Sequence, residues 1–132
     1  MGNLTKNISR HEVACKCKCG LDTMDFETIM VVQDTCDFFA LKLGLPKVTL
    51  IVTSGSRCLG YNRKPASEGG PGSNDGSQHP KSRAMDIKIL EVSPDDVYDY
   101  LVKRYPVQYG IGKYKTFTHI DTRTNGPARW EG

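Results

Sequence analysis

Two histidines and one aspartate give this chain the residue types of a catalytic metal site. His79 lies seven positions before Asp86 in GSQHPKSRAMDI (76–87), and His119 lies in TFTHIDTR (116–123). A catalytic zinc takes three protein ligands, usually imidazole or carboxylate, and leaves its fourth position to water. His79, Asp86 and His119 meet that count. Such a ligand set would leave zinc Lewis-acidic, suited to polarising a carbonyl and to lowering the pKa of bound water. The spacing of His79 and Asp86 alone is a weak pattern, and it fits a solvated loop histidine and an ordinary strand-edge charge about as well.

The segment RAMDIKIL (83–90) is predicted to be a strand that presents Asp86. Met85, Ile87 and Ile89 alternate on one face, so Asp86 points away from the apolar layer. A position on a sheet holds a metal ligand more rigidly than a loop does.

The segments VQYGIGKY and TFTHIDTR are predicted to form a β-hairpin that presents the second histidine. In the second strand Phe117, His119 and Asp121 share one face, because side chains alternate along a strand.

A long helix is predicted from Asp22 to Gly44, where apolar residues recur at three- and four-residue steps. Asp22 or Thr23 can cap its start, and Gly44 followed by Pro46 ends it. The predicted buried face consists of Phe26, Ile29, Met30, Cys36, Phe39 and Leu43.

The remaining elements complete an α+β pattern. KVTLIVTSG (47–55) is β-branched and predicts a strand. SPDDVYDYLVKRYP (93–106) predicts a helix, with Ser93 as its cap and Pro94 at its first position. Residues 55–78 are rich in glycine and predict a long loop, which in a compact domain is usually functional or disordered. We therefore expect an α+β fold with a mainly antiparallel sheet and flanking helices.

Length and composition predict one domain spanning residues 1–132. The net charge is +3, from 18 basic and 15 acidic residues. These charges are interspersed, and neither a basic stripe nor an aromatic platform is present, so a nucleic-acid partner is not expected. No apolar run suits a membrane helix and the N-terminus lacks a signal-peptide core, so we expect synthesis in the cytoplasm and no membrane partner.

Residues 1–20 form a cysteine-rich N-terminal segment that ends in CKCKCG (15–20). The five cysteines are Cys15, Cys17, Cys19, Cys36 and Cys58. The odd count without a signal sequence argues for reduced thiols. His11 and the three clustered cysteines could bind a structural zinc, but its ligand pairs are usually two to four residues apart. In an extended segment Cys17 would face away from its neighbours. We favour buried thiols, and the second metal stays an open alternative.

Four segments together resemble the zinc D-Ala-D-Ala carboxypeptidase family, whose relatives include murein endopeptidases and hedgehog signalling domains. These segments are SGSRC, SQHPKSRAMDI, GIGKY and FTHIDTR…ARW, which run from Ser54 to Trp130. The ending resembles a branch of small peptidases found in phages and bacteria. The resemblance implies a hedgehog/DD-peptidase-like fold and one Zn²⁺ held by His79, Asp86 and His119. It also implies that Arg57 faces the site and stabilises an oxyanion, as a fixed guanidinium can.

Two positions depart from the family pattern. Ser82 replaces a glycine three residues after the first ligand, which is tolerable unless the backbone there needs positive φ. Thr116 stands where many relatives carry the catalytic Glu or Asp. Asp121 is the leading substitute as the acid or base, although it could equally orient His119. Glu68 and Asp75 in the loop are weaker candidates.

The expected function is therefore a zinc metallopeptidase that cleaves peptidoglycan stem peptides, as a carboxypeptidase or an endopeptidase. Catalytic roles are expected for Arg57 and Asp121. The chain would act as a monomer, for example as a phage lysin that reaches the wall through a holin or with the virion. The alternative is a non-catalytic zinc module that binds wall peptide or a protein partner.

Overall fold

The computed structural model describes residues 3–73 and 76–132. A five-stranded sheet runs through it in the order β1-β2-β4-β3-β5. The strands are β1 (Leu50–Ser54), β2 (Ala84–Ile89), β3 (Gly110–Lys113), β4 (Thr118–Asp121) and β5 (Ala128–Glu131). All neighbours pair antiparallel except β3 and β5, which are parallel. The expected α+β class with a mainly antiparallel sheet is confirmed, as is the β3–β4 hairpin. β5 was not predicted.

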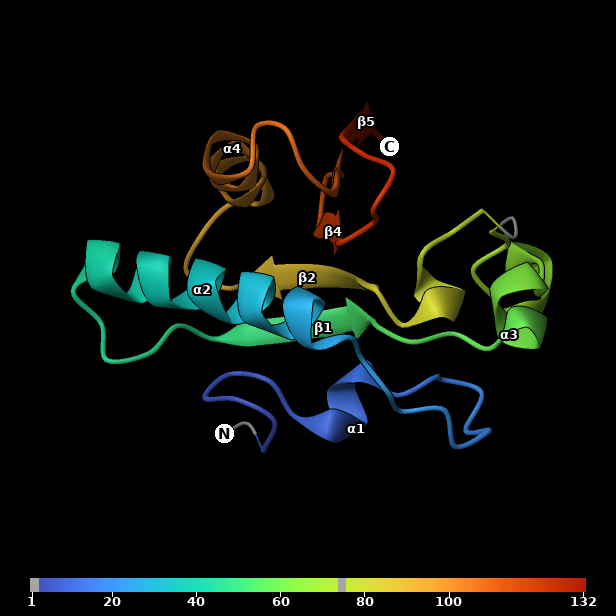
Figure 1. Cartoon of the computed structure of the whole chain (residues 1–132). Coiled ribbons are helices and arrows are strands. Elements are labelled where there is room, and N and C mark those ends of the chain that lie inside the picture. The colour runs from blue at the N-terminus through green and yellow to red at the C-terminus, as the bar shows by residue number, and fades with distance from the viewer. Residues whose placement is uncertain (1–2, 74–75) are drawn as a thin grey trace.

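Helices flank this sheet (Figure 1). They are α1 (Arg10–Val13), α2 (Phe26–Leu43), α3 (Leu59–Arg63) and α4 (Pro94–Arg104), with short 3₁₀ helices η1 (Ala66–Glu68) and η2 (His79–Lys81). α2 and α4 contact the sheet and each other, whereas α1 packs against the edge strand β1 and α3 lies against η2.

The core confirms one predicted strand face. Met85, Ile87 and Ile89 of β2 are buried in a cluster with apolar side chains of α2, α4 and the other strands, while Lys88 is only half-buried. Burying this alternating set fixes the register, since a shift by one residue would turn it to the opposite face. Asp86 is thereby held on the face opposite the core.

The long helix begins later than predicted and buries only part of the predicted face. Asp25, not Asp22 or Thr23, caps α2 by accepting a hydrogen bond from the Glu27 backbone N–H, and Gly44 ends it in the left-handed conformation. Ile29, Cys36 and Phe39 are buried as predicted, whereas Phe26, Met30 and Leu43 are exposed. α2 turns its polar residues Thr28, Gln33 and Thr35 inward instead.

The second predicted helix is confirmed as α4. The Ser93 side chain accepts a hydrogen bond from the Asp96 backbone N–H and Pro94 occupies the first helical position. This helix crosses the C-terminal strands and anchors β4 through a hydrogen bond from the Thr118 hydroxyl to the Pro94 carbonyl.

The segment 55–78 is not a structureless loop. It contains α3 and η1, and its described part folds back on itself through the bond from Ser73 N–H to the Asn62 carbonyl. A long polar stretch can keep a defined shape where such internal bonds replace an apolar core.

The N-terminal cysteines also differ from expectation. All five cysteines are free thiols, and Cys15 and Cys36 are buried, but Cys17 and Cys19 are exposed. The prediction of a buried thiol cluster is wrong for those two residues.

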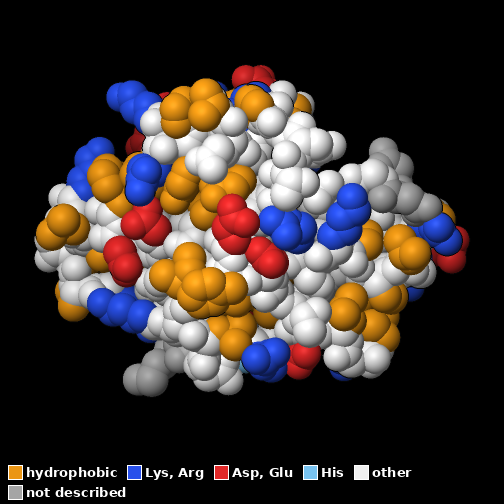
Figure 2. Space-filling view, viewed as in Figure 1, with side chains coloured by type: hydrophobic (Ala, Val, Ile, Leu, Met, Phe, Trp, Pro, Cys, Tyr) orange, Lys and Arg blue, Asp and Glu red, His pale blue; other side chains and the backbone are white. Residues whose placement is uncertain are grey.

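The surface agrees with the charge pattern of the sequence. On the face shown in Figure 2, acidic and basic side chains are interspersed between patches of apolar atoms. None of the helices in the described part of the chain is both long and apolar enough to cross a membrane.

Candidate active site

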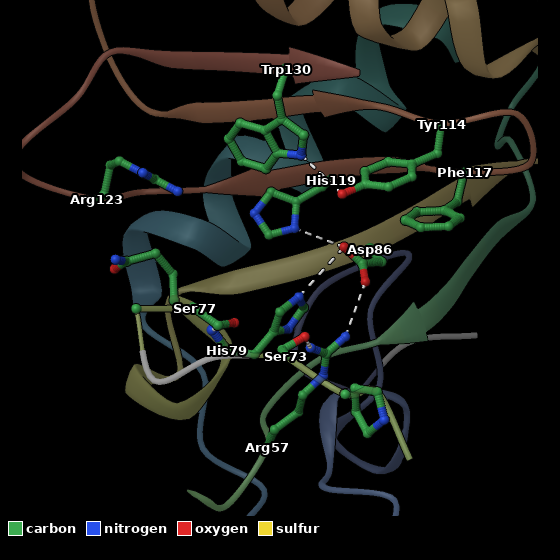
Figure 3. A pocket seen from close by; sticks show the side chains of 14 residues that line it. Arg57, Ser73, Ser77, His79, Asp86, Tyr114, Phe117, His119, Arg123 and Trp130 are labelled. Atoms are coloured by element: carbon green, nitrogen blue, oxygen red, sulfur yellow. Dashed lines mark hydrogen bonds and ion pairs between the residues drawn. The ribbon is translucent and has the colours of Figure 1, made fainter. Parts of the chain in front are cut away.

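The sheet register brings the three predicted metal ligands together. Asp86 on β2 lies directly opposite His119 on β4. His79 enters from η2, just before β2 begins. His119 Nδ1 lies 2.8 Å from Asp86 Oδ1, and His79 Nε2 lies 3.5 Å from the same oxygen. One donor atom of each residue lies within 4.8 Å of the others, and all three side chains are buried at the bottom of a pocket (Figure 3).

His79 is held by the turn after β1. Its Nδ1 lies 2.6 Å from the Gly55 carbonyl oxygen. Because a carbonyl only accepts, Nδ1 carries the proton and Nε2 keeps its lone pair for a metal. Gly55 itself is required here, since a Cβ at this position would lie 2.6 Å from the Val13 carbonyl oxygen. The Ser77 hydroxyl accepts a hydrogen bond from the His79 backbone N–H and so orders the approach to the ligand.

His119 is held from the opposite side by Asp121. Its Nε2 lies 2.7 Å from Asp121 Oδ2, which leaves Nδ1 to face Asp86. Asp121 is fully buried and also accepts hydrogen bonds from the Arg123 guanidinium at 2.8 Å and from the Gly110 backbone N–H. Burial would raise the pKa of Asp121, but the bonds from Arg123 and His119 outweigh it and lower that pKa to about 2. These contacts match the orienting role that the sequence left open for Asp121.

Arg57 lies beside the second oxygen of Asp86. Its Nη2 is 3.4 Å from Asp86 Oδ2, while Oδ1 faces the two histidines. Burial would raise the pKa of Asp86, yet its hydrogen bonds to His119 and His79 hold that pKa well below the ordinary range. Asp86 is therefore an ionised carboxylate whose Oδ1 faces the ring nitrogens of both histidines, while Arg57 contacts its Oδ2.

The Arg57 guanidinium is fixed by several partners. Its Nε donates to the Ser54 hydroxyl at 2.9 Å, and its Nη1 donates to Asn62 Oδ1 and to the Ser73 hydroxyl, each at 3.2 Å. Both Arg57 and Ser73 line the pocket. The structure thus places a buried, rigid cation at the side of the three candidate ligands, as expected.

Aromatic side chains form the opposite wall of this pocket of about 610 Å³. Tyr114 and Phe117 stack with ring centroids 4.4 Å apart, and Trp130 Nε1 donates to the Tyr114 hydroxyl at 2.9 Å. Figure 3 shows Trp130 beside His119, and their ring centroids are 5.0 Å apart. The wall supplies apolar surface next to the polar centre, a combination typical of small-molecule and peptide sites.

A glycine in β3 makes room for that wall. Asp86, His119, Gly112 and Trp130 form one row across four strands. A Cβ on Gly112 would lie 2.5 Å from Trp130 Nε1, so the indole lies over this residue only because it has no side chain. Gly110 similarly leaves space for Asp121.

The pocket offers few acids. Among the described residues, Asp86 is the only carboxylate that lines it. Thr116 and Glu68 do not line the pocket, and Asp121 lies behind His119. Asp75 lies outside the described residues.

The departure at Ser82 has a structural consequence. Its backbone adopts φ 55°, the left-handed conformation that favours glycine. The Ser82 hydroxyl lies 3.1 Å from the hydroxyls of Thr23 and Ser56, and its carbonyl accepts a hydrogen bond from the Asp25 N–H. A serine is therefore less favourable than glycine for this backbone conformation, but its hydroxyl makes contacts that join η2 to the chain before α2.

The donor set fits zinc. Two imidazole nitrogens and one carboxylate oxygen converge, and a catalytic zinc is held by such ligands with a fourth position open. The outer partners fit as well, because metal-binding histidines usually donate their second N–H to a carbonyl or a carboxylate. Gly55 and Asp121 are those partners here.

Sequence reasoning did not assign Tyr114 and Arg123 to the site. The glycines of GIGKY were the signal that could have found them, because a strand with two glycines leaves room for neighbouring side chains. Phe117 and Trp130 form part of the pocket wall.

The protein-family model described as Peptidase M15 matches residues 6–121 of the chain. Comparisons with curated proteins and with solved structures return no match. The matched range includes the three candidate ligands, Arg57 and Asp121. Membership of this family indicates a metallopeptidase that acts on peptidoglycan-like substrates. The chain belongs to the Peptidase M15 family, in agreement with the resemblance of its motifs to the zinc D-Ala-D-Ala carboxypeptidases.

Proposed function

We propose that this protein is a zinc peptidase that hydrolyses amide bonds in peptidoglycan stem peptides, as a D-Ala-D-Ala carboxypeptidase or a murein endopeptidase. The observation that carries the proposal is the convergence of His79 Nε2, Asp86 Oδ1 and His119 Nδ1 at the bottom of an open pocket. When bound there, zinc would polarise the scissile carbonyl and lower the pKa of a water molecule.

Arg57 stabilises charge beside this centre. Its guanidinium is buried and positioned by Ser54, Asn62 and Ser73, so it does not need to reorganise during the reaction. In the proposed reaction it orients Asp86 and offers positive charge to the oxyanion that develops at the carbonyl.

Asp121 positions His119. Its carboxylate is bound by His119 Nε2 and by two nitrogens of Arg123, and a group with a pKa of about 2 accepts a proton weakly at neutral pH. We therefore propose that Asp121 holds the ring of His119 and is not the general base.

Tyr114 lines the pocket with a hydroxyl that can donate a hydrogen bond. Its oxygen accepts the hydrogen bond from Trp130 Nε1, so its own O–H is left to donate toward a substrate. We propose that this hydroxyl binds the substrate carbonyl or the leaving amine.

The alternative, a non-catalytic module that binds wall peptide or a protein partner, rests on one observation. The described part of the pocket contains no acid other than Asp86, while many relatives carry a catalytic Glu or Asp. Four points remain predictions: the role as a phage lysin, holin-dependent or virion-associated release from the cytoplasm, the single-domain organisation and the monomeric state.

Purified muropeptides distinguish these functions. We expect the zinc-loaded protein to convert them to shorter peptides, with mass spectrometry showing either loss of a terminal D-alanine or cleavage within the stem. Pre-treatment with a chelator should abolish the conversion. Tight binding of the peptides without any cleavage would favour the module.

A further inference from the structure

We propose that Cys15, Cys17, Cys19 and Cys58 bind a second zinc ion, separate from the candidate active site. The sulfurs come from two parts of the chain, the turn after α1 and the residue that follows Arg57. All four lie within 4.8 Å of one another, whereas the second metal site considered from the sequence included His11 and not Cys58.

The spacing of the sulfurs matches a tetrahedron. Cys15 and Cys17 are 3.4 Å apart, Cys17 and Cys58 are 3.5 Å apart, and Cys15 and Cys58 are 3.9 Å apart. Zinc–sulfur bonds of about 2.3 Å require sulfurs ~3.8 Å apart at the corners of a regular tetrahedron. A disulfide would need an S–S distance of about 2.05 Å, so these contacts are not disulfides. Three sulfurs at these separations, with the sulfur of Cys19 within 4.8 Å of each of them, suit one shared cation.

The one-residue spacing of Cys15, Cys17 and Cys19 would separate their side chains only in an extended segment, where they would alternate sides. The backbone of this segment is not extended. Instead the Lys18 N–H bonds to the Cys15 carbonyl, and Lys18 and Gly20 adopt φ 64° and 95°. The Cys15 N–H then bonds to the Leu21 carbonyl and closes the turn. Curling the chain in this way points alternate cysteines toward one centre.

Backbone N–H groups donate hydrogen bonds to two of these sulfurs. The Cys58 N–H donates to Cys15 Sγ, and the Tyr61 N–H donates to Cys58 Sγ, both at 3.4 Å. Lys16 and Lys18 alternate with the cysteines. Four thiolates around zinc carry a net negative charge, which backbone N–H groups and nearby lysines offset.

The proposed ion would have a structural role. Four protein ligands complete the zinc shell and leave no open position for a substrate. The cluster joins the N-terminal turn to the segment Gly55–Cys58, where Ser56 N–H also bonds to the Val13 carbonyl. Gly55 holds His79, and Arg57 adjoins Asp86. A zinc ion at the cysteines would therefore brace the segment that positions both residues.

Metal content of the full chain, purified under reducing conditions, tests this proposal. We expect about two zinc ions per chain in the wild type and about one in Cys17→Ser or in His119→Ala. The double variant should contain almost none. Cys36→Ala is the matched control, because Cys36 is buried in α2 away from the cluster, and it should retain both ions.

Cobalt substitution of the wild type needs no variant and reports the ligands directly. Cobalt in the cysteine site should give an intense near-ultraviolet absorption from sulfur-to-metal charge transfer, and His119→Ala should retain it. Absence of this band in cobalt-loaded wild type would overturn the proposal, as would a disulfide among the four cysteines in protein handled without oxidant. Neither result would bear on the peptidase function, because the active-site ligands contain no sulfur.

Discussion

His119 and Asp121 lie two residues apart on β4, and the 2.7 Å contact between Nε2 and Oδ2 leaves Nδ1 as the histidine atom that faces Asp86. Side chains two positions apart on a strand share a face, so the pairing follows from β4 being extended. Gly110 completes the arrangement, because any side chain there would collide with the Asp121 carboxylate.

This relationship predicts the effect of Asp121→Asn. The variant should bind zinc at the His79/Asp86/His119 site ~10–100-fold more weakly. The reason is that a neutral amide, unlike the carboxylate, neither fixes the imidazole of His119 nor raises its basicity. Turnover should largely recover at saturating zinc. Competition with a chromophoric chelator measures the affinity, with the exposed Asp99 of α4 changed to asparagine as the control. Unchanged zinc affinity together with lost turnover would instead identify Asp121 as the base.

Arg57 is predicted to act on turnover. Arg57→Ala should lower kcat by ~10²-fold or more, the loss typical of removing one oxyanion donor, while the zinc content stays near that of the wild type. Arg57→Lys should recover only part of kcat, because an ammonium cannot reproduce the guanidinium fork that reaches Ser54, Asn62 and Asp86 together. Steady-state kinetics on a purified muropeptide measure the effect. Full activity in Arg57→Ala would leave this arginine a purely structural part of the pocket wall.

Tyr114→Phe removes one hydroxyl from the aromatic wall and keeps the ring. We expect kcat to fall ~10-fold or more with zinc content unchanged, because the variant loses the proton donor but keeps the stacking on Phe117. Phe117→Leu is the companion variant, since it changes the apolar wall without touching a donor. A wild-type kcat in Tyr114→Phe would show that the Tyr114 hydroxyl takes no part in the reaction.

Gly112→Ala tests the row of residues across β2, β4, β3 and β5. The added methyl must displace Trp130, so the KM for muropeptide should rise and the tryptophan fluorescence should shift. Gly60→Ala on α3 is the control, because a Cβ there meets no atom within 4 Å. Identical spectra and kinetics in Gly112→Ala and wild type would show that the indole does not depend on this glycine.

The sequence predicted those parts of the site that local rules determine. The alternation of Met85, Ile87 and Ile89 oriented Asp86, and the same rule paired His119 with Asp121. Cap chemistry located α4 through Ser93. Each of these inferences needs only the residues of one element, and each agrees with the structure.

The sequence failed where distant segments decide the outcome. Phe26 and Met30 fit the apolar periodicity of α2, yet they are exposed. The helix instead buries Thr28, which contacts Thr122, and Gln33, which contacts Asn7 of the N-terminal segment. β5 is short and pairs parallel to β3, with no sequence pattern to mark it. Cys58 reaches the N-terminal cysteines only through the fold.

Zinc-dependent cleavage tests most directly whether His79, Asp86 and His119 form the active site of a zinc peptidase. Metal-free protein is titrated with zinc while the release of new amino groups from a purified muropeptide is followed, for wild type and for His79→Ala. We expect no cleavage without metal, cleavage that rises with zinc occupancy in the wild type, and almost none in the variant. Cleavage that persists in metal-free protein, or that survives in His79→Ala, would contradict it.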